Sequence, residues 1–191
     1  MARPLIRVLL VALAVVSPDA AVRPSSCPLA ASSSLPDVLA SKVATLRAAH
    51  GSDPLAWSFR AAEFALSRAR ALAAASAGLS HDAASAAYGE NLAMISALDT
   101  SVGTSLSAAE RALSLWYGES AAYDYASPGY SSQTGHFTQL VWRATRAFGA
   151  GVAVSPDGRW YYVAFEFDPP GNQVLPGAFV ANVAEANAGT A

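Results

Sequence analysis

Cysteine is almost absent from this sequence: Cys27 is its one cysteine, so no disulfide can form within the chain. A domain without disulfides depends on its apolar core for stability. The 191 residues are 53% hydrophobic and 14% charged, which suffices for one domain with a sizeable core. Cys27 lies in a segment rich in serine and proline, where we expect a free thiol or an incidental linker residue.

Charge of one sign and long apolar runs are also missing. The 12 basic and 14 acidic residues give a formal net charge of −2 without a basic cluster, so we expect no nucleic-acid partner. The apolar run Val8–Val16 follows Arg3 and Arg7; it is too short to span a bilayer but typical of a secretory signal. We therefore expect a signal peptide over residues 1–20, a linker over 21–34, secretion to the extracellular space and no stable membrane span. A short membrane anchor is the alternative.

Two common catalytic motifs do not occur either. The sequence has neither the HExxH helix of zinc proteases nor the GxSxG turn of α/β hydrolases. A serine nucleophile with His136 as its base stays open, because such triads occur in any chain order. Nothing in the sequence selects among its neighbours Ser131, Ser132 and Thr138.

The spacing of apolar residues predicts two helices early in the domain. Pro36 suits a first turn, and we expect a helix over residues 36–49. A turn at Gly51–Pro54 precedes a second helix over residues 55–77. Apolar residues recur there at intervals of three and four: Leu55, Phe59, Ala62, Leu66, Ala69 and Leu72.

Further elements are expected in the second half of the chain. A capping box from Ser107 to Glu110 predicts the start of a third helix that ends near Glu119. A short helix is expected over residues 137–142, and residues 176–191 form an Ala-, Asn- and Gly-rich tail without expected structure.

Strands are expected on either side of a tight turn near the end of the domain. Residues 147–154 and 160–168 flank a turn at residues 155–159, which predicts an antiparallel hairpin. The second strand alternates two sets of side chains: Tyr161, Val163, Phe165 and Phe167 on one face, and Trp160, Tyr162, Ala164 and Glu166 on the other. Both faces are apolar enough to be covered by helices, which indicates an α+β layered domain.

Carboxylates and imidazoles are the remaining candidates for chemistry. Glu90 lies on an apolar-flanked segment, and Glu119 lies at a helix C-terminus, where the helix dipole disfavours a negative charge. Both acids require partners, and His81 and His136 are the evident ones in a chain with few basic residues nearby. Two imidazoles and two carboxylates can hold a divalent metal together with water, although a solvated or hydrogen-bonded histidine is the commoner finding.

Several segments together resemble the CAP superfamily, which comprises cysteine-rich secretory proteins, antigen five and class-one plant pathogenesis-related proteins. They are HGSDPLAW (50–57), YGENLA (88–93), LWYGESAAYDY (115–125), GHFTQLVWRAT (135–145) and YYVAFEFDPPGN (161–172). The similarity is greatest to fungal and plant members and covers about residues 38–172, so a CAP domain is expected over 35–175.

The resemblance implies a three-layer α-β-α sandwich with a central antiparallel sheet. It also implies a cavity lined by two histidines and two glutamates, which match His81, Glu90, Glu119 and His136. Some members bind a divalent cation there, and zinc or magnesium is the expected ion. Several bind sterols or other lipids, partly through an aromatic loop that matches the segment with Tyr123, Tyr125, Pro128 and Tyr130.

We therefore expect a secreted, non-catalytic protein that binds a sterol or fatty acid and a divalent cation. One alternative is a secreted hydrolase of glycosidic or peptide bonds that uses Glu90, Glu119 and His136. Another is a signalling protein in defence or host interaction that acts through its surface loops or its C-terminal tail.

Overall fold

The computed structural model of the protein describes residues 34–76, 78–81 and 87–187. The expected signal peptide, nearly all of the linker with Cys27, and the last four residues of the tail lie outside the described residues. No described helix has the length and apolar character that a membrane crossing requires.

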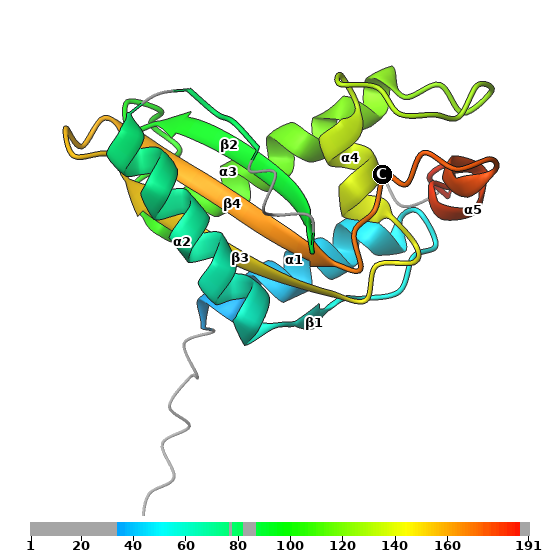
Figure 1. Ribbon diagram of the computed structural model, residues 1–191, viewed down its shortest axis with the longest axis horizontal. Coiled ribbons are helices and arrows are strands. Elements are labelled where there is room, and N and C mark those ends of the chain that lie inside the picture. The colour runs from blue at the N-terminus through cyan, green and yellow to red at the C-terminus, as the bar shows by residue number, and fades with distance from the viewer. Residues whose placement is uncertain (1–33, 77, 82–86, 188–191) are drawn as a thin grey trace, which may run out of the picture. The chain divides into compact units, whose positions relative to one another are not determined.

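A four-stranded sheet forms the centre of the domain (Figure 1). Its strands are β1 (Ala56–Trp57), β2 (Gly89–Ser96), β3 (Ala147–Val154) and β4 (Trp160–Asp168), arranged in the order β1-β3-β4-β2. Strands β3 and β4 form the predicted antiparallel hairpin, and β2 pairs antiparallel with β4. The short β1 was not predicted; it adds to β3 in parallel.

Helices cover both faces of this sheet, as the α-β-α expectation requires. Helix α2 (Phe59–Ala75) crosses one face, whereas α1 (Leu35–Ala48) and α3 (Ser105–Gly118) lie on the other (Figure 1). The short helices are η2 (Glu119–Ala122), α4 (Gly135–Val141) and α5 (Ala178–Asn182). The predicted α+β, three-layer sandwich is therefore confirmed.

Helix α2 begins four residues later than expected, and its buried face differs from the predicted one. The hydroxyl of Ser58 accepts a hydrogen bond from the Ala61 amide, so Ser58 is the N-cap. Phe59, predicted to be buried, is 76% exposed. Ala69 and Leu72 of the predicted face are buried, and the other buried residues of the helix are alanines: Ala61, Ala65 and Ala73.

Two other predicted boundaries were also wrong. Helix α3 starts at Ser105 with Thr104 as its N-cap, and Ser107 is the third helical residue rather than the cap. The side chains of Thr104 and Ser107 each bond to the other's backbone amide, which forms a capping box one turn earlier than predicted. The tail also contains α5, which buries Phe179 against the domain, so its first part is structured.

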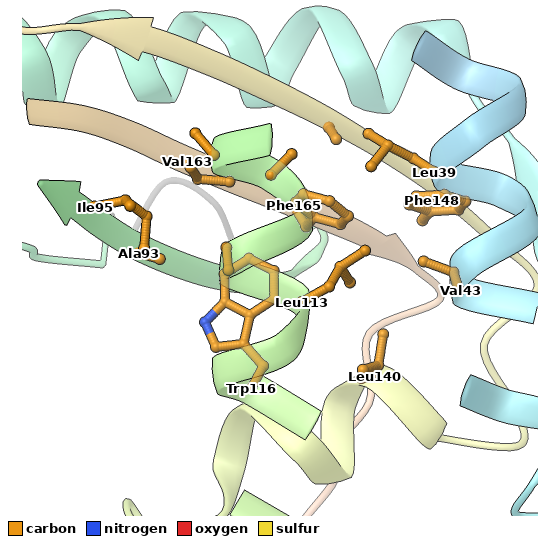
Figure 2. Packing of buried hydrophobic residues seen from close by; sticks show 14 of the residues in the cluster. Leu39, Val43, Ala93, Ile95, Leu113, Trp116, Leu140, Phe148, Val163 and Phe165 are labelled. Atoms are coloured by element: carbon orange, nitrogen blue, oxygen red, sulfur yellow. The ribbon is translucent and has the colours of Figure 1, made fainter. Parts of the chain in front are cut away.

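The larger core lies between the sheet and the layer of α1 and α3 (Figure 2). Phe148, Phe165 and Phe167 project from β3 and β4 toward this layer, where Trp116 meets Phe165 edge to face. The predicted alternation along β4 is confirmed, because Tyr162 and Ala164 pack instead with α2.

On the α2 face, two glycines of β3 allow the helix to lie directly on the sheet. A Cβ at Gly149 would come within 2.1 Å of the Ala62 amide nitrogen, and one at Gly151 within 2.2 Å of the Leu66 amide nitrogen. Backbone atoms cannot give way as a flexible side chain can, so this contact requires glycine at both positions.

Candidate functional site

Glu119 and His136 form a pair between two helix ends. One carboxylate oxygen of Glu119 lies 2.6 Å from Nδ1 of His136. The other accepts hydrogen bonds from the backbone amides of His136 and Phe137, both at 3.0 Å. Glu119, which ends α3, therefore neutralises the exposed amides at the start of α4, and this explains how its charge is tolerated there.

Neighbouring side chains fix the position of the His136 ring. The ring stacks on Trp116 at a centroid distance of 5.9 Å, and the Trp116 indole donates to the carbonyl of Leu92. Asn91 donates from its side-chain amide to the carbonyl of His136. Asn172 donates to the carbonyl of Gly135, so β2 and the segment after β4 both position the start of α4.

Glu90 and His81 form a second pair, and Arg68 of α2 completes it. The Glu90 carboxylate accepts from Nε of Arg68 and bonds to Nδ1 of His81, each at 2.7 Å. Burial alone would raise the pKa of Glu90, but the hydrogen bonds from His81 and Arg68 outweigh it and hold this pKa below its ordinary value. The bond to Glu90 raises the pKa of His81 above its ordinary value.

Glu166 lies next to this pair and was not predicted to belong to the site. It is the cross-strand neighbour of Glu90 and is fully buried, and no donor among the described residues reaches its carboxylate oxygens, so only its own proton could form a hydrogen bond, to Glu90. Desolvation, followed by the negative charge of Glu90, raises the pKa of Glu166 to about 9. The alternation of β4 places Glu166 on the apolar face with Tyr162 and Ala164, and that pattern was the available signal for a buried acid.

Both pairs meet at one cavity of about 280 Å³, which His81, Glu90 and His136 line. Asn91 and Asn172 add amide groups to its wall. The four predicted side chains therefore lie near one another as two imidazole–carboxylate pairs, His81 with Glu90 and His136 with Glu119. The sequence did not reveal the contributions of Arg68, Asn91 and Asn172, because each depends on contacts between distant segments.

Two imidazoles, those of His81 and His136, line this cavity and are its candidate cation ligands. Each ring uses Nδ1 to bond a carboxylate, the arrangement that orients metal-ligating histidines and leaves Nε2 for the ion. In the segments that the structure describes, no group of three or more His, Cys, Asp or Glu side chains is arranged to hold a metal. In this arrangement Glu90 and Glu119 bond to the imidazoles, so His81 and His136 remain as candidate donors; imidazole suits zinc, whereas magnesium prefers oxygen ligands.

The four loop residues expected to contact lipid lie in different surroundings. Tyr123 is only 7% exposed and packs with Phe137 in a third apolar cluster, and Tyr125 packs against the same cluster. Pro128 is half-buried. Tyr130 is 57% exposed and lines the cavity of the two pairs.

The remaining histidine is structural. The ring of His50 is 2% exposed; its Nδ1 bonds to the Ala184 carbonyl at 2.8 Å, and its Nε2 bonds to the Tyr117 hydroxyl at 3.1 Å. It therefore links the end of α1 to α3 and to the C-terminal segment.

Comparison with known proteins gives a consistent group of relatives. The model of the cysteine-rich secretory protein (CAP) family matches residues 40–167. Pathogenesis-related protein 1A of Nicotiana tabacum is 36% identical over 130 residues, which cover 67% of this chain and 71% of that protein. Golgi-associated plant pathogenesis-related protein 1 of Homo sapiens is 46% identical over 68 residues, 36% of this chain and 44% of that protein. Protein PRY2 of Saccharomyces cerevisiae is 39% identical over 97 residues, 50% of this chain and 25% of that protein.

The alignments thus span less than half of the human and yeast relatives. Among solved structures, Na-ASP-1 has a TM-score of 0.62 at 18% identity and covers 88% of this chain and 46% of its own. NaASP2, solved with Zn2+, has a TM-score of 0.55 at 21% identity and covers 78% of this chain and 83% of its own. At these identities the two structures share the fold.

Proposed function

This chain belongs to the cysteine-rich secretory protein (CAP) family, and on that premise we propose that it is a secreted binding protein rather than an enzyme. Its ligand is an apolar molecule with one polar end, a sterol or a fatty acid, and it also binds a divalent cation. The observation that carries the proposal is the cavity at which both imidazole–carboxylate pairs meet beside the exposed ring of Tyr130.

The lipid half of the proposal is supported by Tyr130, an exposed tyrosine that lines a polar cavity. A cavity of about 280 Å³ is slightly smaller than typical small-molecule sites, so it suits the polar end of a larger ligand. Asn91 and Asn172 each use one hydrogen of the side-chain amide within the protein, which leaves the second for a hydroxyl or carboxyl group. The apolar body of the ligand would lie on Tyr130 and on the half-buried Pro128.

The cation half is supported by the orientation of the imidazoles. Carboxylates on Nδ1 of His81 and His136 orient each ring and direct Nε2 away from the carboxylate. A bound cation would supply a positive charge beside the polar end of the ligand. Secretion is supported by the charged start and apolar run of residues 1–20.

The lipid half is tested by titrating the protein with the fluorescent sterol dehydroergosterol and, separately, with palmitate. Tyr130→Ser should weaken binding about tenfold, since it removes a large apolar contact. Val174→Ser is the matched control, because Val174 is 78% exposed but outside the loop. Unchanged affinity in Tyr130→Ser, or an equal loss in Val174→Ser, would contradict the role of the loop.

The cation half is tested by calorimetric titration with zinc and with magnesium. His136→Ala should lower the affinity at least tenfold, as expected when one of two protein ligands is lost. His50→Gln is the control, because that ring bonds to Ala184 and Tyr117 instead. Equal binding in wild type and His136→Ala would refute a cation site at the pairs, and turnover of a glycan or peptide lost in Glu90→Gln would favour a hydrolase.

A further inference from the structure

Strand β3 has an edge that is open along most of its length. Strand β1 pairs with β3 only at Ala56↔Ala147 and Trp57↔Phe148. After a last hydrogen bond from the Ser58 amide to the Phe148 carbonyl, the chain turns into α2. Figure 1 shows β1 beside only one end of β3, so β3 from Gly149 onward has no neighbouring strand on this side among the described residues.

The backbone groups that point to this open edge follow from the alternation of the strand. The Phe148 carbonyl points toward β1, whereas the Ser155 amide donates to Trp160 of β4. Because successive residues point to opposite edges, the amides and carbonyls of Ala150 and Val152 also point toward the open side. In the part of the chain that the structure describes, no backbone or side-chain group bonds to them.

An apolar groove lies along this same edge. A cavity of about 380 Å³ is bounded by Ala150 and Val152 of β3, by Leu39 of α1 and by Leu66 of α2. Trp57 also lines it, and the indole Nε1–H of Trp57 is buried without an acceptor among the described residues. The groove therefore combines apolar walls with unpaired backbone groups and one unpaired side-chain donor.

The groove carries a single negative charge. Glu63 of α2 is the one charged side chain among its lining residues, and Glu63 has no ion-pair partner within the described segments. Phe59 at the rim is 76% exposed. An occupant with one basic group near Glu63 and apolar groups elsewhere would be complementary to this surface.

We propose that the open edge of β3, between α1 and α2, binds an extended apolar peptide by strand addition. The peptide continues the line of β1, forms ladder hydrogen bonds with Ala150 and Val152, and places a lysine or arginine near Glu63. This site is separate from the cavity of the imidazole–carboxylate pairs, so the proposal is independent of the proposed lipid and cation function.

A peptide suits these features better than a lipid does. The backbone of Ala150 and Val152 presents both donors and acceptors at the repeat of a strand, which only another extended backbone matches in full. A hydrocarbon chain could fill the apolar walls but would leave those groups and the Trp57 indole buried and unpaired, which is unfavourable. An exposed edge of this kind is otherwise protected by lysine or proline, and β3 has neither.

The test uses the full chain, labelled with ¹⁵N, and a peptide of alternating valine and threonine with a central lysine. Two analogues carry N-methyl groups on alternate residues, one set on each edge of the peptide. The amides of Ala150 and Val152 should shift downfield and exchange more slowly when the parent peptide binds. One N-methyl analogue should bind about tenfold more weakly than the other, because only one edge of the peptide forms the ladder.

Two protein variants locate the site. Val152→Pro removes the edge-facing amide but no bond to β4, and it should weaken binding about tenfold, with the fold checked by the remaining amide spectrum. Glu63→Lys should weaken the lysine peptide and strengthen a glutamate version, with the difference reduced by added salt.

Three results would overturn the proposal. The first is no change at Ala150 and Val152 at millimolar peptide. The second is equal binding of the parent peptide and both N-methyl analogues, which would indicate an apolar site without strand pairing. The third is concentration-dependent protection of these amides without peptide, together with a dimer in sedimentation, which would indicate that a second copy of the chain occupies the edge.

Discussion

The two faces of the sheet are packed by different means. Toward α1 and α3, the sheet presents Phe148 and Phe165 (Figure 2), and Phe167 belongs to the same cluster, so large side chains fill the space. Toward α2, Gly149 and Gly151 bring the helix backbone against β3, and alanines fill the contact. One layer is thus stabilised by buried apolar area, and the other by close approach of the backbone.

The buried charged groups of the two layers differ in the same way. Arg47 of α1 is fully buried but donates to the carbonyls of Asp53, Leu140 and Trp142 at 2.7–3.0 Å. Glu166, on the α2 face, receives no hydrogen bond from a described residue and has another acid, Glu90, as its polar neighbour. This buried acid lies next to Glu90 of the candidate site. Buried polar groups that receive no hydrogen bond are rare, and they occur preferentially at functional sites.

The cavity lies where these two layers meet at the end of β2. Glu119 and His136 belong to the layer of α3 and α4, whereas Glu90 bonds to Arg68 of α2. One half of the site is therefore held by the layer of α3 and α4, and the other half by α2. Substitutions in each layer show how far the two differ.

The largest effect is expected when the paired charge of the α1 layer is removed. Arg47→Met should lower the free energy of unfolding by about 3–5 kcal/mol, because several buried carbonyls lose their donor at once. Desolvation, with a contribution from Arg146, lowers the pKa of Arg47 to about 10, so the group remains charged at neutral pH. Urea denaturation measures the loss.

Arg111→Met is the matched control for this prediction. The Arg111 side chain is 42% exposed and lies 3.1 Å from Asp99, so removing this surface pair should cost about 0–1 kcal/mol. Equal losses in the two variants would show that the buried hydrogen bonds of Arg47 contribute nothing special.

The next effect concerns the close contact of the α2 layer. Gly151→Ala should destabilise the protein by about 2–3 kcal/mol, because its Cβ would meet the backbone of Leu66 and force α2 away from the sheet. Gly118→Ala, in α3, is the same change with no atom within 4 Å of the new Cβ, and it should be neutral or stabilising by about 0.5–1 kcal/mol. Thermal unfolding of both variants decides whether sterics or helix propensity controls the outcome.

Much of the fold could be predicted because its signals are local. Pro36 marked the start of α1, and the alternation from Trp160 to Phe167 gave the two faces of β4 correctly. The strand β1 was missed because two residues carry no period, and the start of α2 was displaced because Leu55 and Phe59 imitate a helical face. Tertiary pairing with β3 overrode that local pattern.

The site was only partly predictable for the same reason. Glu119 required a partner at a helix C-terminus, and the structure supplies it through His136 and the amides of α4. The donors Arg68 and Asn172 reach the site from other elements, and no local pattern indicates them. Glu166 was assigned to the apolar face of β4, but its cross-strand position opposite Glu90 depends on the register of β2.

A moderate effect on the free energy of unfolding is expected from Glu166, the buried acid of the α2 layer. The pKa of Glu166 is raised from 4.5 to about 9, so between these values the folded state holds a proton that the unfolded state releases. Stability from this group is therefore complete below pH 4.5 and is lost as pH rises toward about 9, by about 1.4 kcal/mol per unit at most. Arg68, His81 and Glu90 are the charged neighbours that modify the slope.

Glu166→Gln isolates this titration. The variant should match wild type near pH 4 and become steadily more stable than wild type as the pH rises through 7, because an amide cannot ionise. Denaturant midpoints measured across this range give the difference. A constant offset between the two proteins at all pH values would show that Glu166 does not carry a raised pKa.

The smallest effect concerns the helix caps, which the two layers share. Ser58→Ala at the start of α2 and Thr104→Ala at the start of α3 each remove a side-chain acceptor, and each should cost about 1 kcal/mol in urea denaturation. Ser58→Asp should restore the loss, since aspartate caps equally well. If both variants lose a similar free energy of unfolding, the two helix layers differ in packing and buried charge. If only Ser58→Ala is destabilised, the layers differ in how the helix is capped.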